Sequence, residues 1–173
     1  MAFYPSSTPG YSVSDVFSSA FTDSVWMHDI DHHKLILLTG GGKRKEYENP
    51  SEALPSLARF VTGRKKWLIS GYNIYQVNLK PDGKHYSTDF VRRDSGTIGF
   101  SSALSDKDGN LVAVGDKLVV ITNEKVLTAP AYYLSDQLAI DKANRIWIAN
   151  RSNRLYCFEV SGTGKDAKLS LLK

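Results

Sequence analysis

Short apolar runs alternate along the chain with polar breaks that contain glycine, aspartate or asparagine. Two stretches follow the same order, Asp106 to Thr122 and Asp141 to Glu159. Each has Asp-Lys, a turn, a β-rich run, a polar break and a second β-rich run. The two aspartates stand 35 residues apart. Repeats of about 40 to 45 residues that carry several strands each are typical of β-propeller blades.

Two weaker copies of this pattern precede the clear pair, at Trp26 to Thr39 and Phe60 to Val77. We align Ile36, Trp67, Val112 and Trp147 as equivalent positions. Each unit then contains strand, hairpin, strand, break and strand, and a fourth strand is expected in linking segments such as Ser87 to Arg92 and Glu124 to Ala129. The prediction is an all-β fold, a β-propeller or partial propeller of about four blades made of short antiparallel strands. We expect a single domain over residues 1–173, with residues 1–22 irregular or strand-completing.

Turn chemistry and burial patterns agree with this interpretation. Asp108-Gly109-Asn110 and Pro81-Asp82-Gly83 are typical of hairpin turns, because glycine accepts positive φ and Asp or Asn bonds its own backbone. The apolar run Leu111–Val114 suits a strand covered on both faces, so it should be more buried than the outer segments Ser87–Arg92 and Lys168–Leu172. Helical periodicity is scarce, and only Asn49–Phe60 could form a short helix.

Composition excludes several classes of protein. The net charge is +4, but the basic residues are scattered, which disfavours the continuous basic stripe of a duplex DNA-binding protein. No run approaches the ~20 apolar residues of a membrane span, and the N-terminus as it stands does not read as a secretory signal. Cys157 is the only cysteine, so an intrachain disulfide is impossible, and we expect it to be a small buried hydrophobe.

The unit from Asp141 to Ala149 resembles the repeat of two-component regulator propellers. That repeat has an acidic turn with Gly or Asn, then Leu or Ile, Trp, Ile and a small residue, and Leu155-Tyr156 match its Leu-aromatic ending. The unit from Asp106 fits with Val112 in the tryptophan position. Both units depart from the repeat, because the usual threonine is Gly115 or Asn150 and the usual glycine before the closing leucine is Lys117 or Arg154. The resemblance implies the periplasmic sensing region of a bacterial hybrid sensor kinase, often directed at oligosaccharides. The location would then be periplasmic or extracytoplasmic if a signal has been trimmed, and otherwise cytoplasmic.

Motifs that bind metals or phosphate are weak. His28 and His32 would share a strand face about 13 Å apart, too far for one ion. The Asp106 loop lacks the acidic twelfth ligand of a calcium loop, because Lys117 stands there, and Gly40–Arg44 does not match a P-loop. Asn150-Arg151-Ser152 is a glycosylation sequon by pattern alone. We predict no metal and no cofactor.

Catalysis is not expected either, because acids that recur at one place in each unit, Asp31, Asp106 and Asp141, are more simply hairpin formers. We therefore predict a non-catalytic ligand- or partner-binding propeller segment, most simply from a bacterial sensor. The alternatives are an intracellular protein-interaction scaffold and a polysaccharide-acting enzyme. Self-association or further blades are expected, because an open arc leaves apolar sheet faces uncovered.

A ligand site is predicted on the loops between second and third strands and the segments that lead into the innermost strands. An oligosaccharide or another anionic ligand would suit its cations and aromatic rings, and the acidic hairpins would lie at the opposite end. The predicted ligand-binding residues are Lys43, Arg44, Lys45, Tyr72, Lys117, Tyr132, Tyr133, Arg151 and Arg154.

Overall fold

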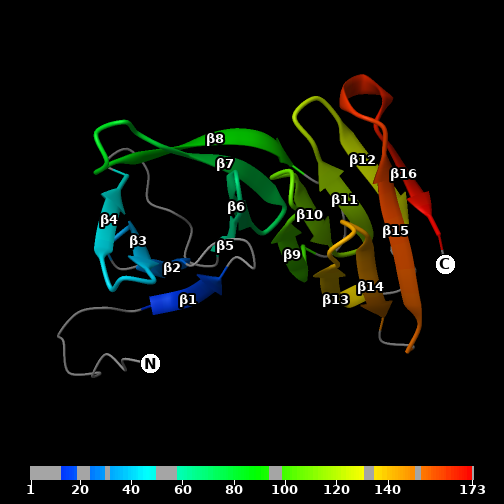
Figure 1. The fold of residues 1–173 in the computed structure, drawn as a ribbon, viewed down its shortest axis with the longest axis horizontal. Coiled ribbons are helices and arrows are strands. Elements are labelled where there is room, and N and C mark those ends of the chain that lie inside the picture. Colours follow the sequence, from blue (N-terminus) through cyan, green and yellow to red (C-terminus); the bar gives the residue numbers. More distant parts are fainter. Residues whose placement is uncertain are drawn as a thin grey trace.

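The computed structural model describes residues 13–18, 24–29, 32–49, 58–93, 99–130, 135–150 and 153–172. Within these ranges the regular elements are β-strands and one short 3-10 turn, η1 (Gly164–Asp166). The strands form four sheets of four strands each, and every sheet is an antiparallel meander in chain order. Figure 1 shows the sheets following one another from the blue end of the chain to the red end. The prediction of an all-β fold with about four units is confirmed.

We number the four sheets as blades in chain order. Blade 1 contains β1 (Val13–Ser18), β2 (Ser24–Asp29), β3 (Lys34–Thr39) and β4 (Arg44–Glu48). Blade 2 contains β5 (Ala58–Thr62), β6 (Lys66–Ser70), β7 (Asn73–Leu79) and β8 (Tyr86–Arg93). Blade 3 contains β9 (Ser102–Ser105), β10 (Leu111–Val114), β11 (Lys117–Ile121) and β12 (Val126–Pro130). Blade 4 contains β13 (Ser135–Ile140), β14 (Ile146–Asn150), β15 (Leu155–Ser161) and β16 (Lys168–Leu171).

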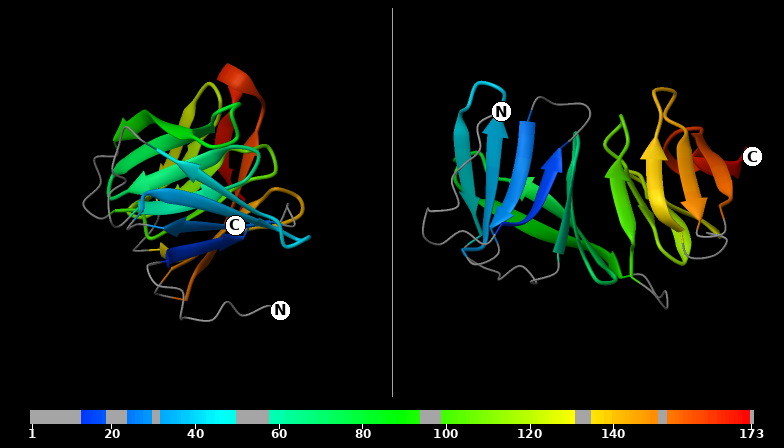
Figure 2. Two further views of the ribbon diagram at one scale, coloured as in Figure 1. Left: turned by 90° about the vertical axis from the view of Figure 1, so that its left-hand side faces the viewer. Right: turned by 90° about the horizontal axis from the view of Figure 1, so that it is seen from below.

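The first strands of successive blades contact one another, β1 with β5, β5 with β9 and β9 with β13. The fourth strands are the opposite edges of the sheets. The blades therefore form an arc with the first strands inside, and the right-hand view of Figure 2 shows the sheets in succession along it. The strands differ in burial as predicted. All four residues of β10 are buried, whereas most residues of β8 and β16 are exposed or half-buried.

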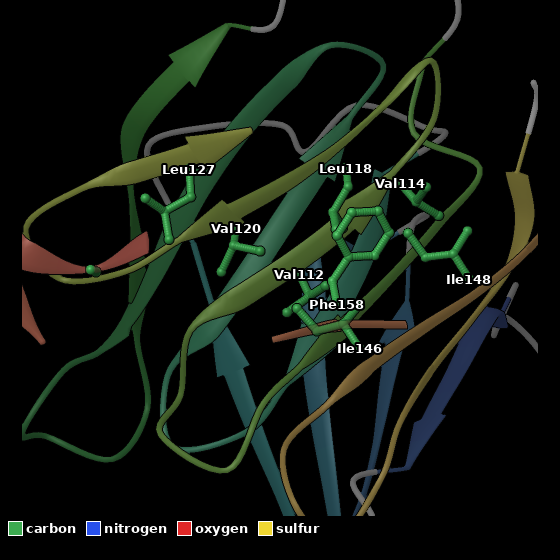
Figure 3. Packing of buried hydrophobic residues seen from close by; sticks show 9 residues of the cluster. Val112, Val114, Leu118, Val120, Leu127, Ile146, Ile148 and Phe158 are labelled. Carbon is green, nitrogen blue, oxygen red and sulfur yellow. The ribbon is translucent and has the colours of Figure 1, made fainter. Parts of the chain in front are cut away.

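Apolar side chains fill the spaces between blades because successive residues of a strand point to opposite faces. In β10, Leu111 and Ala113 pack toward blade 2, while Val112 and Val114 pack toward blade 4. Figure 3 shows the second of these clusters, in which Phe158 lies beside the valines of blade 3. Blades 1 and 2 are joined in the same way, with the ring of Trp26 tilted against that of Phe60 at 5.7 Å between ring centroids.

The alignment of the first unit was wrong by one strand. Ile36 lies on β3, the third strand of blade 1, whereas Trp67, Val112 and Trp147 all lie on second strands. The segment considered for a short helix ends in strand β5, which includes Phe60, and residues 50–57 lie outside the described residues. Among the described residues, no helix has the length and apolarity that a membrane span requires.

Candidate functional site

The hairpin between the first and second strands of blade 3 is organised by Asp106. Its backbone N–H donates to the carbonyl of Asn110 at 3.0 Å, and the N–H of Gly109 donates to the carbonyl of Asp106 at 3.1 Å. Oδ1 of Asp106 accepts the N–H groups of Asp108 and Asn110 at 2.9 and 2.8 Å. Gly109 has a φ of 85°, a left-handed conformation that glycine adopts at little cost. The aspartate therefore holds the turn that the sequence predicted.

Blade 4 repeats this turn with Asp141. Oδ1 of Asp141 accepts the N–H groups of Ala143 and Arg145 at 2.9 and 3.0 Å, and Asn144 takes the left-handed position with a φ of 65°. Oδ2 accepts Nε1 of Trp147 at 3.0 Å. This hydrogen bond, together with the N–H of Arg145, lowers the pKa of Asp141 to about 2. The carboxylate is thus an acceptor fixed in the turn and does not serve as a proton donor at neutral pH.

The prediction that recurring acids form hairpins is confirmed for Asp106 and Asp141, whereas Asp31 lies outside the described residues. An asparagine makes the same turn between the second and third strands of blade 4. Oδ1 of Asn150 accepts the N–H of Arg154 at 3.0 Å, and the side chain is buried. The amide of the sequon is therefore used inside the fold and is not presented to solvent.

Asn144 links the Asp106 and Asp141 hairpins to each other. Its Oδ1 accepts the N–H of Lys107 at 3.2 Å. Its Nδ2 lies 3.4 Å from Oδ2 of Asp108 and 3.5 Å from Oδ2 of Asp106. A side chain from blade 4 thereby satisfies backbone and carboxylate groups of blade 3, so the two hairpins lie side by side.

A hollow of about 220 Å³ lies at this junction between blades 3 and 4. It is bounded by four segments: the Asp106 hairpin, Asn144 of the Asp141 hairpin, the β11–β12 connection, and the β15–β16 connection that contains η1. Its volume is below the roughly 300 to 1,000 Å³ of sites for drug-sized ligands, so it fits a small group or one end of a longer ligand. The lining residues are Asp106, Asp108, Asn110, Thr122, Asn123, Glu124, Asn144, Val160, Gly162, Thr163, Gly164 and Ala167.

The lining offers both donors and acceptors. Asn123 and Asn144 carry amide groups of both kinds, while Asp108 and Glu124 add carboxylate oxygens. The hydroxyl of Thr163 makes no capping bond to η1. Gly164 leaves room for Glu124, because a Cβ at Gly164 would stand 3.0 Å from Oε2 of that side chain. The hollow is therefore polar and rich in hydrogen-bonding groups.

Cations near the hollow are held by other groups. Nζ of Lys125 donates to the carbonyls of Lys165 and Ala167 at 3.2 and 3.1 Å. Lys65, from blade 2, donates to Oδ1 of Asn123. These lysines connect neighbouring blades, and the lining itself contains no basic side chain.

Of the nine predicted ligand-binding residues, only some share one end of the sheets. Tyr72, Lys117 and Arg154 lie in or beside connections between second and third strands. Lys43, Arg44 and Lys45 lie instead on the β3–β4 connection and at the start of β4, because the alignment of the first unit was wrong by one strand. In a meander that connection is at the other end of the sheet. Tyr132, Tyr133 and Arg151 lie outside the described residues.

The predicted separation of charge between the two ends is not seen among the described residues. Lys107 and Lys142 follow Asp106 and Asp141 directly in their hairpins. The lysine and arginine of the β3–β4 segment belong, by topology, to that same end of blade 1. The hairpin end therefore carries both signs of charge.

Two histidine–carboxylate pairs lie in blades 1 and 2, away from the hollow. No group of three or more His, Cys, Asp or Glu side chains suited to a metal ion occurs in the part of the chain that the structure describes. His32 is bound instead through Nδ1 to Oδ2 of Asp29, at 2.9 Å. The carboxylate of Asp82 accepts hydrogen bonds from the side chain of His85 and from the backbone N–H of Lys84. These bonds, of which the one from His85 has the larger effect, lower the pKa of Asp82 to about 2.

Among protein families, curated proteins and solved structures, only solved structures match the chain. No protein-family model matches the chain, and no curated protein matches it. Solved structures do match. A streptogramin B lyase is 16% identical with a TM-score of 0.59, and covers 95% of this chain and 55% of its own. The inactive H270A virginiamycin B lyase from Staphylococcus aureus, solved with quinupristin, is 14% identical with a TM-score of 0.62, and covers 97% of this chain and 57% of its own.

The fold is that of a β-propeller arc. YCF48 bound to D1 peptide also matches, with 14% identity, a TM-score of 0.52, and coverage of 88% of this chain and 50% of its own. The chain thus spans about half the length of these solved structures. They include lyases and a peptide-bound protein, and at such identities the likeness concerns the fold alone. The predicted propeller class is confirmed, while the specific two-component regulator family is not shown.

Proposed function

We propose that this chain is a non-catalytic binding segment of a β-propeller, and that the hollow between blades 3 and 4 holds a hydroxyl-rich group. One residue of an oligosaccharide is the ligand that fits best. The observation that carries the proposal is the lining itself, in which carboxylate, amide and hydroxyl groups from four connections surround about 220 Å³. A sugar ring offers hydroxyls that donate and accept in several directions, and such a mixed lining satisfies both roles.

Asp106 has a structural role in the wall of the hollow. Glycosidases need two carboxyl groups that are free to act on the scissile bond. An ionised carboxylate has about four acceptor sites, and Asp106 receives four donors, two backbone N–H groups and the amides of Asn110 and Asn144. Asp106 therefore orders the wall of the hollow. Asp108 and Glu124 are the carboxylates on which a cleavage reaction would have to rely, and recovery of the uncleaved saccharide decides between binding and catalysis.

The resemblance of the Asp141 unit to two-component regulator propellers supports a place in a bacterial signalling receptor. In that setting the saccharide would be the signal, and the segment would lie outside the cytoplasm. A cytoplasmic scaffold would instead present the same end to a protein, and would have no use for a hollow of this size.

An anionic ligand would require a different surface. Tyr72, Lys117 and Arg154 share the opposite end of blades 2 to 4 and keep their predicted role as a proposal. Replacing Lys117 and Arg154 together by alanine leaves a hollow-bound ligand unaffected and weakens an anionic one, most clearly at low salt.

The test is a glycan array followed by calorimetric titration of the best saccharide. Glu124→Ala and Thr163→Val each remove one lining group, and each should weaken binding about tenfold, the cost of one hydrogen bond. Glu159→Ala is the matched control, because Glu159 is exposed on β15 and is not part of the lining. The array should show a saccharide that is recovered unchanged after incubation. The absence of any binder, equal affinities in all three variants, or a cleaved product would each overturn the proposal.

A further inference from the structure

Blade 4 has one apolar face that no described blade covers. Ile146, Ile148 and Phe158 pack toward blade 3. Residues that alternate with them on β14 and β15 point the other way, namely Trp147, Ala149, Leu155 and Cys157. We call this set the outer face of blade 4. Leu155 is 59% exposed there.

Equivalent positions in blades 2 and 3 show what covers such a face. The sheet registers pair Ile69 with Ile74, Val114 with Leu118 and Ala149 with Leu155, each beside the connection between second and third strands. Ile74 and Leu118 are both 0% exposed, because the following blade packs on them. The same register position is buried wherever a following blade is present and exposed in blade 4.

The tryptophans support this comparison. Trp67 occupies the same place in blade 2 as Trp147 in blade 4, and it is buried against blade 3. Its Nε1 donates at 3.3 Å to the carbonyl of Gly109 in the hairpin of that next blade. Trp147 is only half-buried, with Arg145 5.6 Å from its ring centroid. The outer face of blade 4 thus matches the side of blade 2 that meets a following blade.

Blade 1 carries the complementary kind of face. Trp26 and Leu35 pack toward blade 2, so the alternate residues Val25, Met27, Ile36 and Leu38 point away from it. Ile36 is already buried, and the other three are half-buried. These lie on the second and third strands, the same two strands with which blade 3 meets blade 2 through Leu111, Ala113, Val119 and Ile121. Lys34 forms ion pairs with Glu46 and Glu48 across β3 and β4 at 3.2 and 2.9 Å. An apolar centre with a charged rim is the usual anatomy of a protein interface.

We propose that the outer face of blade 4 packs against this face of blade 1 in a second copy of the chain. Two copies joined reciprocally form a ring with two identical junctions and eight blades, within the usual range of about four to eight for propellers. Each junction continues the packing already present between blades 2 and 3, with Leu155 taking the buried position of Ile74. The inference is independent of the ligand proposed for the hollow.

Sedimentation velocity over a range of concentrations tests the proposal on the intact chain. The wild type should be a dimer, and Leu155→Glu should weaken dimerisation by about a hundredfold or more, because it places an unpaired carboxylate in the junction. Leu171→Glu is the matched control. Leu171 is 49% exposed on the same blade but pairs with Phe158, on the side that faces blade 3, so this variant should remain a dimer.

A mixing experiment identifies the partner face. Leu38→Glu, on blade 1, should also give a monomer, and circular dichroism checks that it is folded. An equimolar mixture of Leu155→Glu and Leu38→Glu keeps one intact junction, so it should give a heterodimer although each variant alone is monomeric. A monomeric wild type overturns the proposal, as expected if a blade from elsewhere in a longer chain covers the face. A dimer that resists Leu155→Glu, or a mixture that stays monomeric, overturns it as well.

Discussion

Replacing Asp106 by alanine should destabilise the chain by about 3 kcal/mol. The side chain is only 3% exposed, and it accepts three hydrogen bonds of 2.8 to 2.9 Å, from the N–H groups of Asp108 and Asn110 and from Nδ2 of Asn110. Hydrogen bonds to charged groups contribute about 1.5 to 3 kcal/mol each. We take about 1 kcal/mol for each, the usual net value of a hydrogen bond once exchange with water in the unfolded chain is counted.

Urea denaturation measures this effect. With a slope of about 2 kcal/mol per molar urea, the midpoint should fall by roughly 1.5 M while the slope is unchanged. Asp108→Ala, in the same turn, is the control, because the Asp108 carboxylate has a single 3.4 Å contact with Asn144 and should cost less than about 1 kcal/mol. If the two variants lose the same stability, the hairpin is not held by Asp106 and our account of the repeated acidic turn is wrong.

Two further predictions concern the aspartates and glycines of the hairpin turns. Asp82 and Asp141 have pKa values lowered from 3.8 to about 2 in the folded chain, so their contribution to stability is complete above about pH 4 and is lost as the pH falls toward 2. Urea midpoints at pH 5 and pH 2.5 should therefore differ less in Asp141→Asn than in the wild type, and an equal difference would contradict the hydrogen-bonding scheme. Gly109→Ala should cost about 2 to 3 kcal/mol, since it combines a φ of 85° with a Cβ only 3.0 Å from Cβ of Arg64. Gly83→Ala has a φ of 67° but open space, so it should cost about 1 kcal/mol, and equal losses would mean that the contact between blades contributes nothing.

Turn chemistry made the sheets predictable but left the strand order of the first unit open. Asp106 and Asp141 each bond the backbone two and four residues ahead, and this local pattern is visible in the sequence. Asn150 makes a turn of the same kind between second and third strands. Because one chemistry serves different hairpins of a blade, the acidic turn before Ile36 could not show that Ile36 lies on a third strand.

The hollow was missed for a different reason. Its lining comes from connections that are distant in sequence, such as those of Asp108, Glu124 and Thr163, and only the packing of blade 4 on blade 3 brings them together. One signal was present in the repeat. Asp108 and Asn144 occupy adjacent positions in equivalent hairpins, and the first-to-second-strand hairpins of neighbouring blades lie at the same end of a propeller. The basic residues of the predicted ligand site were grouped by the same reasoning. Because the first unit was misaligned by one strand, Lys43 to Lys45 lie at the other end of their sheet.

The meander order of each sheet has a consequence for how such a chain can change in length. Every ladder between named strands joins neighbours in sequence and stays inside one blade. A whole blade can therefore be duplicated or deleted without breaking a ladder, whereas an insertion of one or two strands would leave backbone groups unpaired. The contacts that depend on the neighbouring blade are the apolar faces and a few polar links such as that of Asn144 with Lys107. Descendants of this chain are thus free to grow or shrink in steps of four strands, provided that the two end faces remain able to meet a partner.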